Sequence, residues 1–187
     1  PFSISETFQK LNTNSTIAES MLRVEEIQTL CLQHNKQLVI YISMGFGNPY
    51  GDTYNADIAI QWVEALQKLG IGIFAMSDTV GVSNPENISA IFSPLSAAFP
   101  SLEFGAHFHS TKETASEKID TALKSHCFRF DSAIGGIGGC PMAQNDLVGN
   151  LATEQLLLNL EAKGYSLGLN HSALMEAQAM SANIFHV

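Results

Sequence analysis

Basic residues are scarce in this 187-residue sequence. It has nine lysines and arginines against eighteen aspartates and glutamates, which gives a formal net charge of −9 at pH 7. This balance argues against a general nucleic-acid-binding or anionic-membrane surface. The negative net charge does not exclude an anionic ligand, because a few local cations or backbone amides can hold one. We therefore expect no nucleic-acid partner.

Cysteines and long hydrophobic runs are also few. Cys31, Cys127 and Cys140 are an odd number at unrelated spacings, which predicts neither a disulfide framework nor a Cys-based zinc site. The apolar runs fall well short of the roughly 20 residues that span a bilayer, and no basic segment followed by a hydrophobic one opens the sequence. We expect a cytoplasmic protein in a reducing compartment, with no membrane partner.

The remaining composition, 45% hydrophobic and 14% charged, is that of an ordinary globular protein. Short apolar runs alternate with amphipathic helical patterns at nearly constant spacing, which is typical of repeated βα units. No linker, low-complexity tract or shift in composition divides the chain, so residues 1–187 are expected to form a single unit. A complete eight-unit α/β barrel typically needs about 250 residues, more than are present here.

The pattern predicts four buried strands, at residues 38–46, 71–78, 102–109 and 127–134. Helices are expected to begin near Thr16, where Glu19 completes a capping box, then after Asn55 and after Asn84. Pro94 should kink or shorten the third of these helices. Further helices are expected at residues 115–125 and 153–163, with an added terminal helix at 172–185.

The most informative segment spans residues 105–110 and contains His107 and His109 at the end of the third predicted strand. Because side chains alternate across a strand, both rings project from the same face and can converge on one metal ion. Alternatively, His107 and His109 are core histidines with hydrogen-bond partners inside the protein, or histidines exposed to solvent.

The other candidates each follow the carboxyl end of a strand, where the active sites of parallel α/β proteins collect. Asp78 ends the second strand, and a turn or cap residue is its alternative. Four glycines within residues 135–139 precede Cys140. A thiol on a glycine hinge is a plausible proton donor, although a long connection with a small apolar thiol fits the same pattern. Asn150 can offer an amide oxygen to a metal, and Glu154 lies one turn further on; an N-cap at Asn150 or Thr153 is the competing explanation.

Taken in order, these motifs closely resemble the carboxyl-terminal half of the 3-hydroxy-3-methylglutaryl-CoA lyase family. The matching stretches are Ser77-Asp78-Thr79-Val80-Gly81, Gly105-Ala106-His107-Phe108-His109, residues 135–141 and Gly149-Asn150-Leu151-Ala152-Thr153-Glu154. The paired histidines are shared by a wider group of metal-dependent aldolase-like and Claisen-type barrels, whereas the glycine loop that ends in Cys140 favours the lyase. The resemblance implies a partial (β/α)8 TIM barrel, comprising about its last four strands with their helices and a terminal helix.

The resemblance also implies a divalent-metal-dependent lyase that splits 3-hydroxy-3-methylglutaryl-CoA into acetyl-CoA and acetoacetate. His107, His109 and Asn150 would hold Mg²⁺ or Mn²⁺, although the donor set alone also suits zinc. His107 would take part in proton transfer, and Cys140 would be the mobile acid. Asp78 and Glu154 would be supporting carboxylates.

One family segment, Asp-Arg-Glu on the first barrel strand, has no counterpart in this sequence, and it carries the aspartate metal ligand. Activity is therefore expected to need the missing amino-terminal half, either through association with it or in a homo-oligomer, with an acyl-CoA as substrate. A related aldolase or condensing enzyme on 2-keto acids stays open, as does a non-catalytic half-barrel.

Overall fold

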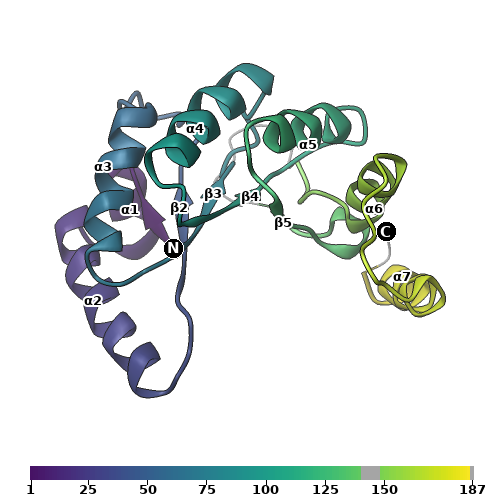
Figure 1. The fold of residues 1–187 in the computed structure, drawn as a ribbon, viewed down its shortest axis with the longest axis horizontal. Helices are drawn as coiled ribbons and strands as arrows, with labels where there is room; N and C mark the ends of the chain where they lie inside the picture. Colours follow the sequence, from purple (N-terminus) through teal and green to yellow (C-terminus); the bar gives the residue numbers. More distant parts are fainter. Residues whose placement is uncertain (140–147, 186–187) are drawn as a thin grey trace.

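The computed structural model describes residues 1–139 and 148–185. Its centre is a five-stranded sheet of order β1-β2-β3-β4-β5, in which every neighbouring pair is parallel. In Figure 1 the strands form the inner side of an arc, and the helices lie around its outer side. The strands are Phe2–Ser3, Val39–Ser43, Ile73–Ser77, Glu103–His107 and Arg129–Asp131. The helices are α1 (Glu6–Thr13), α2 (Ile17–Gln33), α3 (Ala56–Gln67), α4 (Pro85–Ala98), α5 (Ala115–Lys124), the 3-10 turn η1 (Ile134–Gly136), α6 (Thr153–Ala162) and α7 (His171–Phe185).

The repeated βα order is confirmed, and so are several expected helix starts. Thr16 and Glu19 form the predicted capping box of α2, in which each side chain bonds the backbone of the other residue. Asn55 caps α3 by accepting a hydrogen bond from the backbone of Ile58. These local signals work because the cap satisfies N–H groups that no earlier turn of the helix can reach.

Several expected bounds of the elements differ from those observed. The sheet has five strands rather than four, because Phe2–Ser3 pair with the end of β2. The third predicted strand ends at His107 rather than at residue 109. Pro94 does not shorten α4, which continues to Ala98; Ile91 and Leu95, on either side of the proline, are both buried in the core and hold the helix against the sheet.

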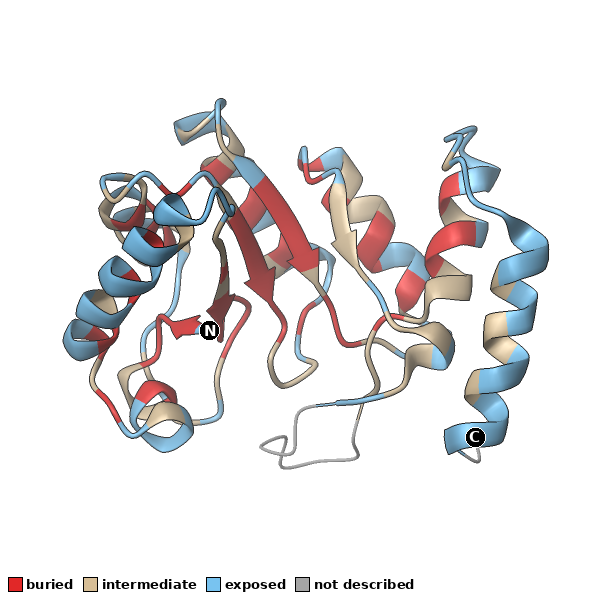
Figure 2. Cartoon of the chain, turned by 90° about the horizontal axis from the view of Figure 1, so that it is seen from below, coloured by how far each residue is buried: buried red, intermediate tan, exposed pale blue. Residues whose placement is uncertain are grey.

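The two faces of the sheet differ in chemistry. One face packs against the helices and is apolar, with Ile42, Phe74 and Ala106 fully buried. Because side chains alternate along a strand, the opposite face carries the residues between them. Toward the carboxyl ends of the strands this inner face presents small or polar side chains, and the strand register sets His107 level with Ser77 on one side and Asp131 on the other. Figure 2 shows the buried centre of the sheet and the largely exposed α7 at the far edge.

None of the helices in the described part of the chain combines the length and hydropathy that a membrane crossing requires.

Asp52 ties the loop after β2 to the start of α1, and its replacement by Ala is expected to lower the free energy of unfolding by about 1 kcal/mol at pH 7. Its carboxylate accepts hydrogen bonds from Ser5 Oγ at 2.6 Å and from the backbone N and Oγ1 of Thr7, both at 3.0 Å. The bond from Ser5 and then the backbone bond from Thr7 lower the pKa of Asp52. A carboxyl group whose pKa is lowered by folding stabilises the protein above its unfolded-state pKa, and this stabilisation is lost as the pH falls through the folded-state pKa.

Urea unfolding of the wild-type chain and Asp52→Ala should therefore differ at pH 7, and the difference should begin to shrink only as the pH falls below roughly 4. The exposed Glu26→Ala is the control and should match the wild type at both pH values. A difference for Asp52→Ala that persists unchanged in acid would count against this role of the carboxylate.

Candidate functional site

A cavity of about 540 Å³ opens at the carboxyl ends of the strands. This is the end of a parallel α/β sheet at which ligands bind. The lining residues are Pro1, Tyr41, Ser43, Ser77, Thr79, His107, His109, Gly138, Gly139 and Asn150. Three of the residues singled out in the sequence, His107, His109 and Asn150, thus meet at one cavity.

The two histidine rings lie side by side, with centroids 5.7 Å apart and planes at 69°. His107 is the last residue of β4, whereas His109 lies beyond the strand and is buried. A short antiparallel bridge joins His109 to Asn150, and the backbone N of Ser110 donates to the carbonyl of Gly149. These backbone contacts bring residues 40 positions apart in the sequence to the same edge of the cavity.

Asn150 is held from both its backbone and its side chain. Its backbone N donates to Gly138 O at 3.0 Å, and its Nδ2 donates to Ile137 O at 2.9 Å. Because the amide nitrogen is occupied by the glycine loop, the amide oxygen is the atom of this side chain that can accept from His109 or bind a cation. Burial lowers the pKa of His109 and outweighs Asp78 and Asn150, which raise it. A neutral His109 ring at pH 7 keeps a nitrogen lone pair for a metal ion.

Asp131 belongs to the site and was not singled out from the sequence. Its Oδ2 lies 3.4 Å from Nδ1 of His107. Burial raises the pKa of Asp131, but its polar contacts with His107 and Tyr41 and the charge of Arg129 together bring the pKa below its ordinary value. Tyr41 also packs edge-on against the His107 ring, with centroids 5.6 Å apart. The available signal was an acidic residue near the end of a strand predicted to lie beside that of His107.

Asp78 lies behind the cavity and does not line it. Its carboxylate forms a buried ion pair with Lys118 of α5 at 3.2 Å and accepts a hydrogen bond from the backbone of Ser83. Lys118 also donates to the carbonyl oxygen of His109 at 2.7 Å. The pair therefore fixes the backbone that carries His109. Lys118 was also missed in the sequence, where its only signal was a lysine beside the apolar Ile119 of α5.

Glu154 also lies outside the cavity lining. From the first turn of α6, both of its carboxylate oxygens accept the backbone N–H of Gly135 at 3.0 Å, and Oε1 also accepts from Gln178 of α7. Glu154 thus anchors the first residue of the glycine segment. The N-cap alternative at Asn150 or Thr153 was wrong, because Ala152 occupies the cap position of α6 and Thr153 is the first residue of the helix.

The described part of the glycine loop is shaped by backbone conformations that favour glycine. Gly135, Gly136 and Gly138 all have positive φ, at 66°, 67° and 95°. A Cβ built on Gly138 would lie 2.8 Å from Nδ2 of Asn150, so only glycine lets the loop approach that side chain so closely. Cys140, the predicted proton donor, lies outside the described residues.

The other two cysteines are not candidates for chemistry. Cys127 is buried, as expected for a core residue, and burial raises the pKa of its thiol to about 12, which keeps it protonated. Cys31 is half-buried on α2.

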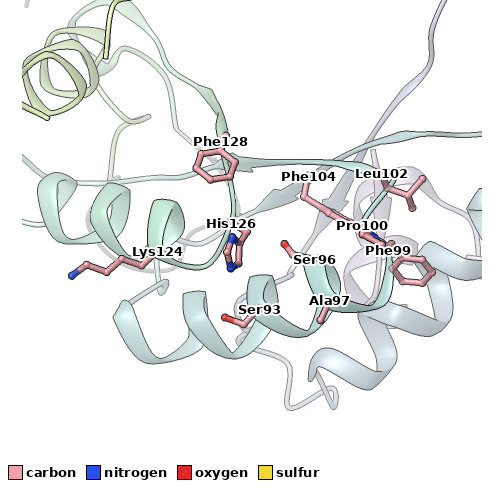
Figure 3. Close-up of a pocket in the computed structure, with 10 residues that line it drawn as sticks. All are labelled: Ser93, Ser96, Ala97, Phe99, Pro100, Leu102, Phe104, Lys124, His126 and Phe128. Carbon is pink, nitrogen blue, oxygen red and sulfur yellow. The ribbon is translucent and has the colours of Figure 1, made fainter. Parts of the chain in front are cut away.

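A second cavity, of about 570 Å³, lies at the opposite end of the sheet (Figure 3). Phe99, Phe104 and Phe128 contribute aromatic rings to it, and His126 and Lys124 are its only ionisable side chains among the described residues. This end of the sheet carries the amino termini of the strands, and residues there usually contribute to stability rather than to catalysis.

The donors at the first cavity suit a divalent cation. Within the described ranges no three His, Cys, Asp or Glu side chains converge as a ligand set. Two imidazoles and an amide do line the same cavity, and together they offer nitrogen and oxygen donors. Mg²⁺ and Mn²⁺ accept such oxygen-containing sets and complete their six positions with water, substrate or a carboxylate.

Comparison with known proteins agrees with this geometry. The parallel α/β sheet is part of a TIM-barrel-related fold, and the family model described as HMGL-like matches residues 2–180. The chain belongs to the HMGL-like family.

Individual relatives point to one activity. The chain is 33% identical to hydroxymethylglutaryl-CoA lyase YngG of Bacillus subtilis (strain 168) over 94% of this chain and 58% of the relative. It is 32% identical to the cytoplasmic 3-hydroxy-3-methylglutaryl-CoA lyase of Homo sapiens, over 92% and 46%. Other relatives are named as mitochondrial forms, for example that of Bos taurus.

Solved structures show the same likeness. The HMG-CoA lyase of Brucella melitensis superposes with a TM-score of 0.89 at 28% identity, over 98% of this chain and 64% of that one. The HMG-CoA lyase from Acinetobacter baumannii, solved with coenzyme A and 3-methylmalate, superposes with a TM-score of 0.85 over 97% and 59%. The carboxyl transferase domain of Rhizobium etli pyruvate carboxylase, 18% identical with a TM-score of 0.62, shares the fold alone.

The chain spans about half the length of the curated relatives it matches. Its five parallel strands correspond to about half of an HMGL barrel. The matched lengths do not bear out the narrower assignment of the chain to the carboxyl-terminal half.

Proposed function

We propose that this chain forms part of a divalent-metal-dependent carbon–carbon lyase that cleaves 3-hydroxy-3-methylglutaryl-CoA to acetyl-CoA and acetoacetate. One observation carries the proposal: His107, His109 and Asn150 meet at one cavity in a chain whose relatives at 32–33% identity are named as lyases of this substrate. A cytoplasmic location agrees with the sparse cysteines and with the names of several relatives.

His107, His109 and Asn150 would hold Mg²⁺ or Mn²⁺. When bound, such a cation supplies Lewis-acid polarisation of substrate oxygens. The chain positions these groups and keeps one of them uncharged. Burial favours the neutral form of His109, and the glycine loop occupies the amide nitrogen of Asn150, so that the amide oxygen is turned toward His109 and not toward the loop. The remaining positions would be filled by water, by substrate and by a carboxylate from the rest of the barrel.

An acyl-CoA is the substrate class that we assign to the cavity. Support comes from the Acinetobacter baumannii lyase, which was solved with coenzyme A and 3-methylmalate. In this chain, Ser43 and Ser77 bring hydroxyl groups to the same cavity as the histidines, and these can orient an oxygen-rich acyl group.

Proton movements are assigned to His107 and Cys140. His107 faces the cavity and contacts the Asp131 carboxylate through Nδ1; its Nε2 can take the proton of the substrate hydroxyl only while that nitrogen is not bound to the cation. Cys140 follows Gly139, which lines the cavity, and is proposed to protonate the product enolate. Asp78 and Glu154 would support these groups from behind, through Lys118 and Gly135.

The test is an assay of the full-length product of the reading frame that encodes this chain. Acetoacetate release from 3-hydroxy-3-methylglutaryl-CoA should require added Mg²⁺ or Mn²⁺ and stop with a chelator, and pyruvate-type substrates should not compete. Competition by pyruvate would favour the alternative of an aldolase or condensing enzyme on 2-keto acids. Metal-independent release, or none, would contradict the proposal.

The assembled protein is proposed to complete the barrel either within a longer chain, with a second chain or in a homo-oligomer. The mass of the active species, measured by light scattering during the same assay, separates these arrangements.

A further inference from the structure

Arg129 lies across the inner face of the sheet, between two carboxylates. Its Nε is 3.3 Å from Oε1 of Glu103, and its Nη2 is 3.5 Å from Oδ1 of Asp131. Tyr41 also makes polar contacts with both Arg129 and Asp131. The guanidinium group therefore joins the outer carboxylate of Glu103 to the one that faces His107.

Gly105 makes room for this arginine. The strand register places Gly105 directly beside Arg129. A Cβ built on Gly105 would lie 2.8 Å from Nη1, 3.1 Å from Cγ and 3.3 Å from Cδ of Arg129. Gly105 has ordinary strand geometry, with no positive φ, so its backbone does not require glycine. What any larger side chain would disturb here is the position of the arginine.

The two oxygens of Asp131 face different charged partners, in addition to the polar contact that the carboxylate makes with Tyr41. Oδ1 faces Arg129, and Oδ2 faces Nδ1 of His107 at 3.4 Å. Among the described residues, neither that Oδ2 nor that Nδ1 meets hydrogen-bond geometry with any partner, although both atoms are buried; the contact between them is an ion-pair distance of 3.4 Å. A carboxylate held in this orientation favours the ring form with hydrogen on Nδ1 and leaves Nε2 with its lone pair for the cavity.

We infer that Arg129, seated over Gly105, is a positioning residue that holds the Asp131 carboxylate against Nδ1 of His107 and thereby selects the ring form that presents Nε2 to the cavity. The consequence for metal affinity rests on the proposed function, whereas the ring form itself does not. Arg129 acts only through Asp131 and touches neither substrate nor metal.

The test measures the ring form of His107 in the full chain by 15N NMR at about pH 8.5, where an ordinary histidine is neutral. Hydrogen on Nδ1 and hydrogen on Nε2 give distinct pairs of nitrogen shifts. The wild type should show Nδ1–H only. Arg129→Met and Gly105→Ala should both give a mixture of the two forms, and Arg129→Lys should restore part of the wild-type spectrum because it keeps the charge.

Gly105→Ala removes no charge and only displaces Arg129, so it separates the effect of the arginine's position from the effect of its charge. Gly72→Ala is its matched control, because a Cβ at Gly72 meets nothing within 4 Å. The same variants are titrated with Mn²⁺: Arg129→Met and Gly105→Ala should bind about 10-fold more weakly, the range in which groups behind metal ligands act. Gly72→Ala should bind as the wild type does.

A His107 ring that stays in the Nδ1–H form in folded Arg129→Met and Gly105→Ala, as judged by circular dichroism, would overturn the inference. If both variants fail to fold, Arg129→Lys is the deciding variant. The inference then requires that its fraction of the Nδ1–H form lies between the fraction in the wild type and one half. Loss of lyase activity in the full-length enzyme with an unchanged ring form contradicts this inference alone. Absence of lyase activity in the wild type contradicts the proposed function alone.

Discussion

Lys118→Met is expected to lower the free energy of unfolding by about 3–5 kcal/mol, because it leaves the buried carboxylate of Asp78 without its cation. Both side chains are almost inaccessible, with 4% of the Lys118 side chain and 0% of the Asp78 side chain exposed. The substitution also removes the hydrogen bond from Nζ to the carbonyl of His109. The effect should therefore be seen both in stability and in the order of the segment that carries His109.

Urea unfolding at pH 7 measures the change, and Lys124→Met is the matched control from the same helix, because Lys124 is exposed. The control should lie within about 0.5 kcal/mol of the wild type. A double variant, Asp78→Asn with Lys118→Met, should be less destabilised than the sum of the two single variants, since neither charge is then left buried alone. A loss below about 1 kcal/mol for Lys118→Met would show that the pair does not stabilise this fold.

His109→Ala is expected to lower the metal-dependent turnover of the full-length enzyme at least about 100-fold. Removing even a group behind a metal ligand costs 10–100-fold, and His109 is assigned as a ligand itself. The site also loses the ring that the bridge to Asn150 places at the cavity. Turnover is followed as acetoacetate release at several Mn²⁺ concentrations, and part of the loss should be recovered as the metal is raised.

His34→Ala is the control for this substitution, since His34 is exposed at the end of α2, away from the cavity lining. It should leave turnover unchanged. A His109→Ala enzyme that keeps more than one tenth of the wild-type turnover at low metal would exclude His109 as a ligand. Circular dichroism of both variants separates this result from unfolding.

The regular part of the fold could be predicted because its signals are local. The Thr16 capping box and the Asn55 cap each lie within a few residues of the helix that they start, and the structure contains both. The strand Phe2–Ser3 could not be predicted, because two residues carry no periodicity and the strand exists only by pairing with Ile42–Ser43. The near-continuous apolar run of β2 predicted cover on both faces, whereas Val39 and Tyr41 are only half-buried in this chain.

Part of the candidate site could likewise be predicted from the sequence, and part could not. His107 and His109 stand two residues apart, so strand geometry alone predicts that their rings are neighbours. Asp131 comes to His107 only through the pairing of β4 with β5, and its register cannot be determined from either segment separately. Lys118 reaches the site across 40 residues, by way of Asp78, and one lysine in a helix gives no sign of its burial.

The central claim is that His107, His109 and Asn150 form one divalent-cation site, and a Mn²⁺ titration followed by electron paramagnetic resonance tests it most directly. The full-length protein should bind one Mn²⁺ per chain, Mg²⁺ should displace it, and His107→Ala, His109→Ala and Asn150→Ala should each weaken binding. His34→Ala should not. Absence of specific Mn²⁺ binding, or affinity unchanged in all three folded variants, would contradict the account.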